Sequence, residues 1–90
     1  MSVSIIIPTP LRAFADGARR VDLTAATVGD ALDVLTSRYP RLRAQLFAGE
    51  RLRPFVNVFL NDENMRDVGG GTCPLHAGDT ISIIPSIAGG

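Results

Sequence analysis

The chain has 90 residues, of which 46% are hydrophobic and 20% charged, enough for one small core but not for two. Nine basic residues balance nine acidic ones, and this zero net charge excludes the strongly basic footprint of a non-specific nucleic-acid binder. Every basic residue is an arginine and the chain has one cysteine, which excludes a lysine nucleophile and an internal disulfide.

The same composition predicts a cytoplasmic chain with no membrane partner. Ser2, Ser4 and Pro8 interrupt the apolar run near the N-terminus, so no signal-peptide pattern is visible. The longest apolar stretches are too short to span a bilayer. The single cysteine, Cys73, fits a reducing compartment.

The first half of the chain predicts a hairpin followed by a helix. Residues 3–7 are rich in β-branched side chains and residues 20–23 alternate, with turn-forming Asp16 and Gly17 between them. Thr27 has the position of a helix N-cap, because Asp30 follows three residues later and apolar residues then recur at helical spacing. The pattern predicts a helix over 28–39, stopped by Pro40.

The second half of the chain predicts shorter elements. We expect the following, in order: a helical turn and then a loop over 41–53, a strand over 55–60, a turn over 61–64, a short returning edge at 65–66, a flexible connection over 68–71, a turn over 76–79, and a last strand over 80–84. This order of strands around one main helix predicts an α+β protein with the β-grasp, or ubiquitin-like, fold. Its mixed sheet has four to five strands, with the first and last side by side and parallel at the centre.

The last two residues, Gly89 and Gly90, indicate that the C-terminus itself takes part in a reaction. Glycine has no Cβ, so a free Gly-Gly end is narrow and unhindered and can thread a tight channel. Residues 1–85 are predicted to form the domain, and residues 86–90 a flexible tail. The α-carboxylate of Gly90 is then the reactive group, and it requires activation, most plausibly as an acyl-adenylate made from ATP.

Two segments of the sequence resemble the ThiS/MoaD family of ubiquitin-like sulfur carriers. They are VNVFLNDE, residues 56–63, and LHAGDTISIIPSIAGG, residues 75–90, which is similar to the family's C-terminal pattern. The segment TVGD, residues 27–30, also resembles the family's helix start. The long arginine-rich stretch after the predicted helix and the Ile-Ala-Gly-Gly end are most similar to the actinobacterial CysO type.

The resemblance implies a carrier and not an enzyme. A MoeB/ThiF-like enzyme would adenylate Gly90 with ATP, and the tail Ile87, Ala88, Gly89 would lead this terminus to its partners. The resulting thiocarboxylate would give its sulfur to an acceptor bound by a second enzyme, a sulfur-accepting synthase. No cofactor or metal is expected on the chain itself, since it has no GxxxxGK[ST] loop, GxGxxG pattern or cluster of metal ligands. The acceptor stays open, whether for cysteine or for another sulfur-containing metabolite.

Strand alternation predicts a surface for docking the activating enzyme. If Ile5, Val58 and Ile83 point toward the helix, then Ile6, Phe59 and Ile84 point the other way. We expect these three to form an apolar row on the open face of the sheet, near the tail.

Several other residues have side chains that could react or bind, but each has a simpler structural interpretation. Cys73 lies beside Pro74 with no evident base, and His76 lies in a predicted turn. Asp62 and Glu63 are adjacent, so in extended chain they point to opposite faces, poorly placed as an acid and base pair. A basic cluster of Arg41, Arg43, Arg51 and Arg53 could contact an acidic patch on a partner, but a solvated loop is the default expectation.

Three other functions remain open. The chain could be a ubiquitin-like modifier of target lysines, a small subunit of molybdopterin synthase held permanently by a large one, or a β-grasp interaction domain with an irrelevant tail. The first two also use the Gly90 terminus. Removal of Gly89 and Gly90 without loss of function would favour the last.

Overall fold

The computed structural model describes residues 2–85 of the chain. The elements, in order, are β1 (Ser2–Ile6), the 3-10 helix η1 (Thr9–Ala15), β2 (Arg20–Thr24), α1 (Val28–Arg38), α2 (Pro40–Leu46), β3 (Phe47–Ala48), β4 (Arg51–Leu52), β5 (Val56–Leu60), β6 (Glu63–Asn64), the 3-10 helices η2 (Met65–Asp67) and η3 (Gly70–Thr72), and β7 (Thr80–Pro85).

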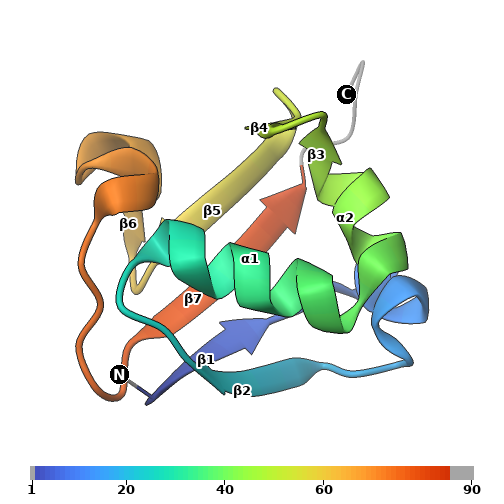
Figure 1. The fold of residues 1–90 in the computed structure, drawn as a ribbon, viewed down its shortest axis with the longest axis horizontal. Helices are drawn as coiled ribbons and strands as arrows, with labels where there is room; N and C mark the ends of the chain where they lie inside the picture. The colour runs from blue at the N-terminus through green and yellow to red at the C-terminus, as the bar shows by residue number, and fades with distance from the viewer. Residues whose placement is uncertain (1, 86–90) are drawn as a thin grey trace.

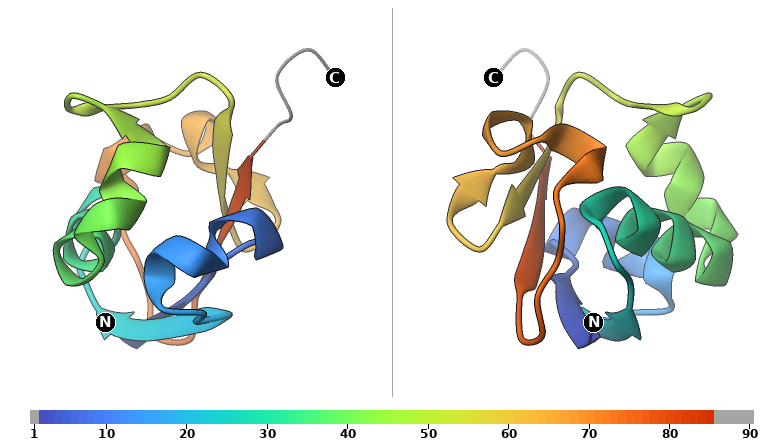
Figure 2. Two further views of the ribbon diagram at one scale, coloured as in Figure 1. Left: turned by 90° about the vertical axis from the view of Figure 1, so that its right-hand side faces the viewer. Right: turned by 60° about the vertical axis from the view of Figure 1, so that its left-hand side comes forward.

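Five of the strands form one mixed sheet in the order β2-β1-β7-β5-β6 (Figure 1). The first and last of its strands in the chain, β1 and β7, are parallel neighbours at its centre, whereas the other pairs are antiparallel. Figure 2 shows α1 and α2 on one side of this sheet. The predicted β-grasp arrangement is therefore confirmed.

The core lies between the sheet and α1. Alternate residues of the central strands are almost fully buried, as the alternation in the sequence predicts: Val3, Ile5, Val56, Val58, Ile81 and Ile83 are at most 2% exposed. The helix contributes Val28, Ala31, Leu32 and Leu35, which recur at the spacing of one helical face. One face of the sheet is thus covered, and the other is left to solvent or to partners.

The start of α1 is fixed by the predicted cap. The backbone of Thr27 is extended, and its side-chain oxygen accepts a hydrogen bond from the Asp30 amide at 3.1 Å. The helix ends at Arg38, one residue before the predicted boundary. Pro40 then starts α2, because proline at the first helical position needs no amide partner.

The predicted opening hairpin is confirmed as β1 paired with β2, but its connection contains a helix that the sequence analysis missed. This connection forms η1, whose Leu11 and Ala15 are buried in the core. Asp16 and Gly17 follow with φ of 54° and 80°, so they make the turn that the sequence predicted.

Three other expectations were wrong in detail. The stretch 41–53, predicted as a helical turn and then a loop, ends in a small separate hairpin, β3 paired with β4, whose turn uses Gly49 at φ 66°. The returning edge strand lies at Glu63–Asn64, because Asn61 adopts a left-handed φ of 56° and shortens the turn. The connection predicted over 68–71 is partly helical, and its Gly71 packs close to Gly29 of α1.

None of the helices found within residues 2–85 is long and apolar enough to cross a membrane.

Candidate functional site

β7 is the last strand of the described structure, and the C-terminal residues 86–90 follow directly after it. Pro85, the last residue of β7, pairs with Val56 at the start of β5 (Figure 1). The predicted tail residues Ile87, Ala88, Gly89 and Gly90 lie outside the described residues. What the structure provides is therefore the support from which these residues begin.

That support is a strand held on both sides at its start and by β5 alone at its end. β7 pairs with β1 from Thr80 to Ser82 and with β5 from Ile81 to Pro85. Its inward side chains, Ile81 and Ile83, are at most 2% exposed. The pairing with β5 and the buried face restrict this strand, so the direction in which it ends is set by the sheet.

Hydrogen bonds between two turns fix the start of β7. The Thr80 amide donates to Asn61 Oδ1 at 3.1 Å, and the Asn61 amide donates to the Thr80 carbonyl at 2.7 Å. The Asn61 side chain also donates to Asp79 Oδ1 at 3.3 Å. These contacts join the β5–β6 turn to the turn before β7, and together they set the register of β5 on β7.

Asp79 is the charged centre of this turn network. The His76 amide donates to its Oδ2 at 2.8 Å, and this bond, with the Asn61 side-chain bond and the nearby His76 ring, holds the pKa of Asp79 below its ordinary value. The His76 ring itself is exposed, with Nδ1 at 3.8 Å from Asp79 Oδ2. His76 therefore lies in a turn, as the sequence indicated.

The outer face of the sheet carries the three predicted docking residues. Ile84 is 48% exposed, whereas Ile6 and Phe59 are half-buried, and all three alternate with inward-facing core residues. Their register is not the continuous row that we expected. Ile6 and Phe59 both pair with Ser82, which separates them, and Ile84 lies two residues further along β7. The three side chains thus surround a serine.

One apolar residue near the end of β7 was missed by the sequence analysis. Phe55 is 40% exposed and lies in the turn just before Val56, the partner of Pro85. We expected it to be the first residue of the strand. Pro54, which cannot donate a ladder hydrogen bond, was the available signal that the strand begins later.

The other candidate residues lie apart from the end of β7. Cys73 is only 6% exposed, and its Sγ lies 3.7 Å from the Pro74 carbonyl oxygen, which agrees with a structural thiol. Asp62 and Glu63 are both exposed at the β5–β6 turn. Within residues 2–85, no three His, Cys, Asp or Glu side chains gather as a metal site would need.

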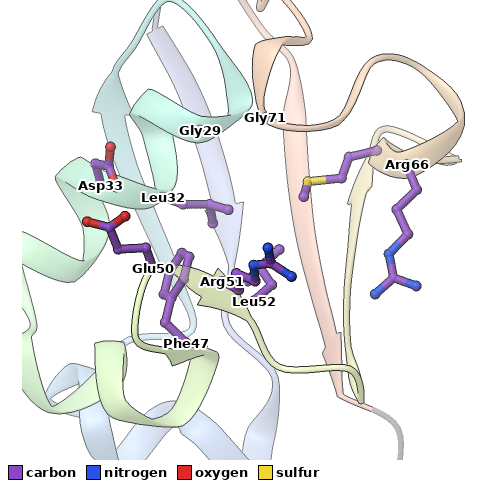
Figure 3. A pocket seen from close by; sticks show the side chains of 10 residues that line it. Gly29, Leu32, Asp33, Phe47, Glu50, Arg51, Leu52, Arg66 and Gly71 are labelled. Atoms are coloured by element: carbon purple, nitrogen blue, oxygen red, sulfur yellow. The ribbon is translucent and has the colours of Figure 1, made fainter.

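A pocket of about 420 Å³ opens on the helical side of the molecule (Figure 3). Its walls come from α1, the β3–β4 hairpin, η2 and η3. Asp33 and Glu50 lie together on one side, with Arg66 on the other. The apolar part of the wall is formed by Leu32, Phe47, Leu52 and Met65. Its walls contain no candidate nucleophile beside a base, so the pocket offers no recognisable catalytic arrangement.

The strand order and the terminal β7 define a small ubiquitin-like protein of the β-grasp class. The model of the ThiS family matches residues 5–90, so this chain belongs to the ThiS family.

The chain is similar to one curated relative over its full length and to another over most of it. The sulfur carrier protein CysO of Mycobacterium tuberculosis (strain H37Rv) is 33% identical over 93 residues, which cover 100% of both chains. The small archaeal modifier protein 3 of Haloferax volcanii is 37% identical over 65 residues, covering 72% of this chain and 71% of the relative. The first relative agrees with the CysO type that the sequence resembles.

The chain is also similar to solved structures of this fold, one of which contains a CysO protein. A chain in the crystal structure of the Amycolatopsis orientalis BexX/CysO complex is 40% identical to this one, with a TM-score of 0.88, over 98% of this chain and 99% of the other. A putative molybdopterin converting factor subunit from Pyrococcus furiosus is 16% identical with a TM-score of 0.73, so it shares the fold alone.

Proposed function

We propose that this chain is a sulfur carrier whose Gly90 α-carboxylate is the working group. A MoeB/ThiF-like enzyme joins this carboxylate to the AMP part of ATP and releases pyrophosphate. Sulfide, delivered by a sulfur source, then displaces AMP and leaves a terminal thiocarboxylate. A sulfur-accepting synthase takes that sulfur for cysteine or another sulfur-containing metabolite.

The observation that carries this proposal is the full-length similarity to CysO sulfur carriers. The geometry is compatible with it, because β7, which pairs with β5 up to Pro85, leads directly to the residues that carry the Gly-Gly end. The sheet therefore sets the place at which residues 86–90 begin, and the last two of these residues, which have no side chain, leave the carboxylate of Gly90 unhindered.

The catalysis belongs to partners in this proposal, and the chain acts as their co-substrate in the cytoplasm. The sequence has no phosphate-binding glycine motif, and ATP is therefore bound by the activating enzyme. The chain itself needs no cofactor, because the bond that is made and broken lies on its own terminus.

We assign docking of the activating enzyme to the outer-face residues Ile6, Phe59 and Ile84, together with the exposed Phe55 near the end of β7. Apolar side chains grouped on an open sheet face are suited to a partner surface. Phe59→Asp is expected to raise the KM for adenylation at least tenfold while the urea midpoint changes little. Thr24→Asp, an exposed change on β2 at the edge of the same sheet, is the control. Unfolding of the Phe59 variant would instead make this residue part of the core.

The first test is intact-mass spectrometry. The 90-residue chain is incubated with a MoeB/ThiF-like enzyme, ATP and a sulfide source, beside a variant that lacks Gly89 and Gly90. We expect a mass gain equal to the replacement of one oxygen by sulfur in the full chain only. Absence of this gain with several activating enzymes that modify their own carriers would count against a sulfur carrier.

Protein modification is the second candidate function, because a small archaeal modifier protein is among the relatives. It predicts isopeptide bonds between Gly90 and lysines of other proteins, which tryptic mass spectrometry detects as branched peptides. This chain has no lysine, so any such bond must lie on another protein or on an N-terminal amine. A permanent place in molybdopterin synthase has support from the fold alone.

A further inference from the structure

The zero net charge of the chain conceals an uneven distribution of charge along the sequence. Residues 38–53 carry five arginines and one acid, Glu50, for a net charge of +4. The rest of the chain carries four arginines and eight acids, for a net charge of −4. We call residues 38–53 the basic lobe; its arginines are Arg38, Arg41, Arg43, Arg51 and Arg53.

The lobe is a structured part of the molecule and not the solvated loop that the sequence analysis expected. Arg43 lies 4.6 Å from the centre of the Phe47 ring and donates to Thr36 Oγ1 at 3.3 Å. The Arg53 Nε donates to the Ala44 carbonyl at 3.1 Å. These contacts tie β3 and β4 to α1 and α2, so the charges keep fixed positions.

Three other arginines of the lobe are exposed, and one of them, Arg51, lies at the wall of the pocket. The side chains of Arg38 and Arg51 are exposed and make no ion pair or hydrogen bond with the residues that the structure describes. The Arg41 guanidinium lies 5.6 Å from the centre of the Phe14 ring, also at the surface. No acid neutralises these three arginines within the described chain, so their charge is available to another molecule.

The basic lobe lies next to the end of β7, from which the C-terminal residues begin. The end of α1, α2 and β3 occupy one side of the molecule, whereas β6 and the β5–β6 turn occupy the other (Figure 1). From β4 the chain runs directly to the start of β5, where Val56 pairs with Pro85. Asp62 and Glu63 lie at the other end of β5. The basic side of the molecule thus adjoins the end of β7, and these two acids lie away from it.

We infer that the basic lobe docks against an acidic surface on the adenylating enzyme, beside the channel that receives the tail. This inference rests on the proposed carrier function and adds the chemistry of the partner surface. A dipolar charge pattern orients an approaching molecule, so that the end of β7 faces an acidic channel mouth before contact.

The charge pattern favours an acidic protein over a nucleic acid. Binding to a phosphate backbone needs a strongly basic footprint, whereas this chain has zero net charge and its basic excess is confined to residues 38–53. A carrier must also leave its partner after each turnover. Steering by exposed charges raises the association rate mainly, and it leaves dissociation fast.

The test compares two triple variants with the same total charge. Arg38→Gln, Arg41→Gln and Arg51→Gln together lower the lobe to +1, whereas Arg19→Gln, Arg20→Gln and Arg66→Gln remove the same charge from elsewhere. Pyrophosphate release by a MoeB/ThiF-like enzyme is measured between low and high NaCl. At low salt we expect the lobe variant to raise KM roughly tenfold with kcat unchanged, and to lose most of the salt dependence.

The remaining outcomes separate the two proposals. An equal rise of KM in both triple variants, or a wild-type KM that salt does not change, would overturn the role of the lobe. The charge-preserving set Arg38→Lys, Arg41→Lys and Arg51→Lys should keep the wild-type KM. Binding of a labelled single-stranded RNA by the wild type, lost in the lobe variant, would assign the lobe to nucleic acid instead. Failure of the wild type to be adenylated at any salt would count against the carrier function itself.

Discussion

In the central strands β1, β7 and β5, every second side chain is buried and each strand is joined to its neighbours by a regular ladder. In the basic lobe, α2 has seven residues, β3 and β4 have two each, and arginine side chains bind carbonyls and an aromatic ring. The strands set the fold through hydrophobic burial, whereas the lobe adds only Leu42 and Leu46 to the fully buried core and carries its arginines at or near the surface. The first is expected to determine stability, and the second to determine which partners bind.

Truncation of a core side chain in β7 is expected to have the largest effect on stability. Ile81 is fully buried, and Ile81→Ala should lower the free energy of unfolding by about 2–5 kcal/mol through lost burial and the cavity left behind. Ile84, in the same strand but 48% exposed, is the matched control, and its change to alanine should cost within about 0.5 kcal/mol. Urea unfolding measures both, and equal effects would contradict the assignment of the two faces.

The contact between α1 and η3 should give the next largest effect. A Cβ at Gly29 would lie 2.9 Å from the Gly71 carbonyl oxygen, a backbone atom that cannot move aside cheaply. Crowding should outweigh the helix preference of alanine, so Gly29→Ala should destabilise the fold by about 1 kcal/mol net. Gly71→Ala meets its nearest atom, the Gly29 Cα, at 3.8 Å and should be tolerated. Thermal unfolding that ranks the two changes in the opposite order would refute this packing.

The turn network at Asp79 should make stability depend on acid pH. The folded-state pKa of Asp79 is depressed, so its contribution is fully present above the unfolded value and is lost as pH falls through the folded one. The window therefore lies at and below about pH 4. Asp79→Asn should lower the free energy of unfolding at pH 7 by about 1 kcal/mol and by less at pH 3. Urea midpoints at both pH values measure this, and a constant difference would argue against it.

The basic lobe should give the smallest stability effect. Arg43 contacts the Phe47 ring and Thr36, so Arg43→Gln should cost about 0.5–1 kcal/mol. Arg38→Gln removes no such contact and should leave the thermal midpoint unchanged. A cost from Arg43→Gln as large as that of Ile81→Ala would remove the distinction between the two regions.

The same contrast explains what could be predicted from the sequence. Alternation over residues 3–7, 56–58 and 81–83 predicts the buried face because a side-chain period of two is a local property of a strand. The Thr27 cap is local as well. The β3–β4 hairpin was missed because it depends on contacts such as Arg53 with Ala44, nine residues apart, which no local pattern encodes.

In the candidate site, too, local patterns were predictable from the sequence, whereas contacts between distant segments were not. The outward direction of Ile6, Phe59 and Ile84 followed from alternation within each strand. The place of Ser82 between Ile6 and Phe59 depends on the register of three strands that are far apart in the sequence. The register of β5 on β7 is fixed by hydrogen bonds between turns at Asn61 and Thr80, and periodicity does not contain this information.

The central position of β7 also has a consequence during protein synthesis. β1 is made first, yet its parallel neighbour β7 is made last, so β1 cannot complete its ladder until the ribosome has released most of the chain. Pairing across so long a separation is slow to form, because the loop between the strands must close first. A chain that stops before Thr80 lacks the middle of its sheet and would be a substrate for proteases. Only a chain that has been translated at least through β7 can therefore complete the sheet and fold.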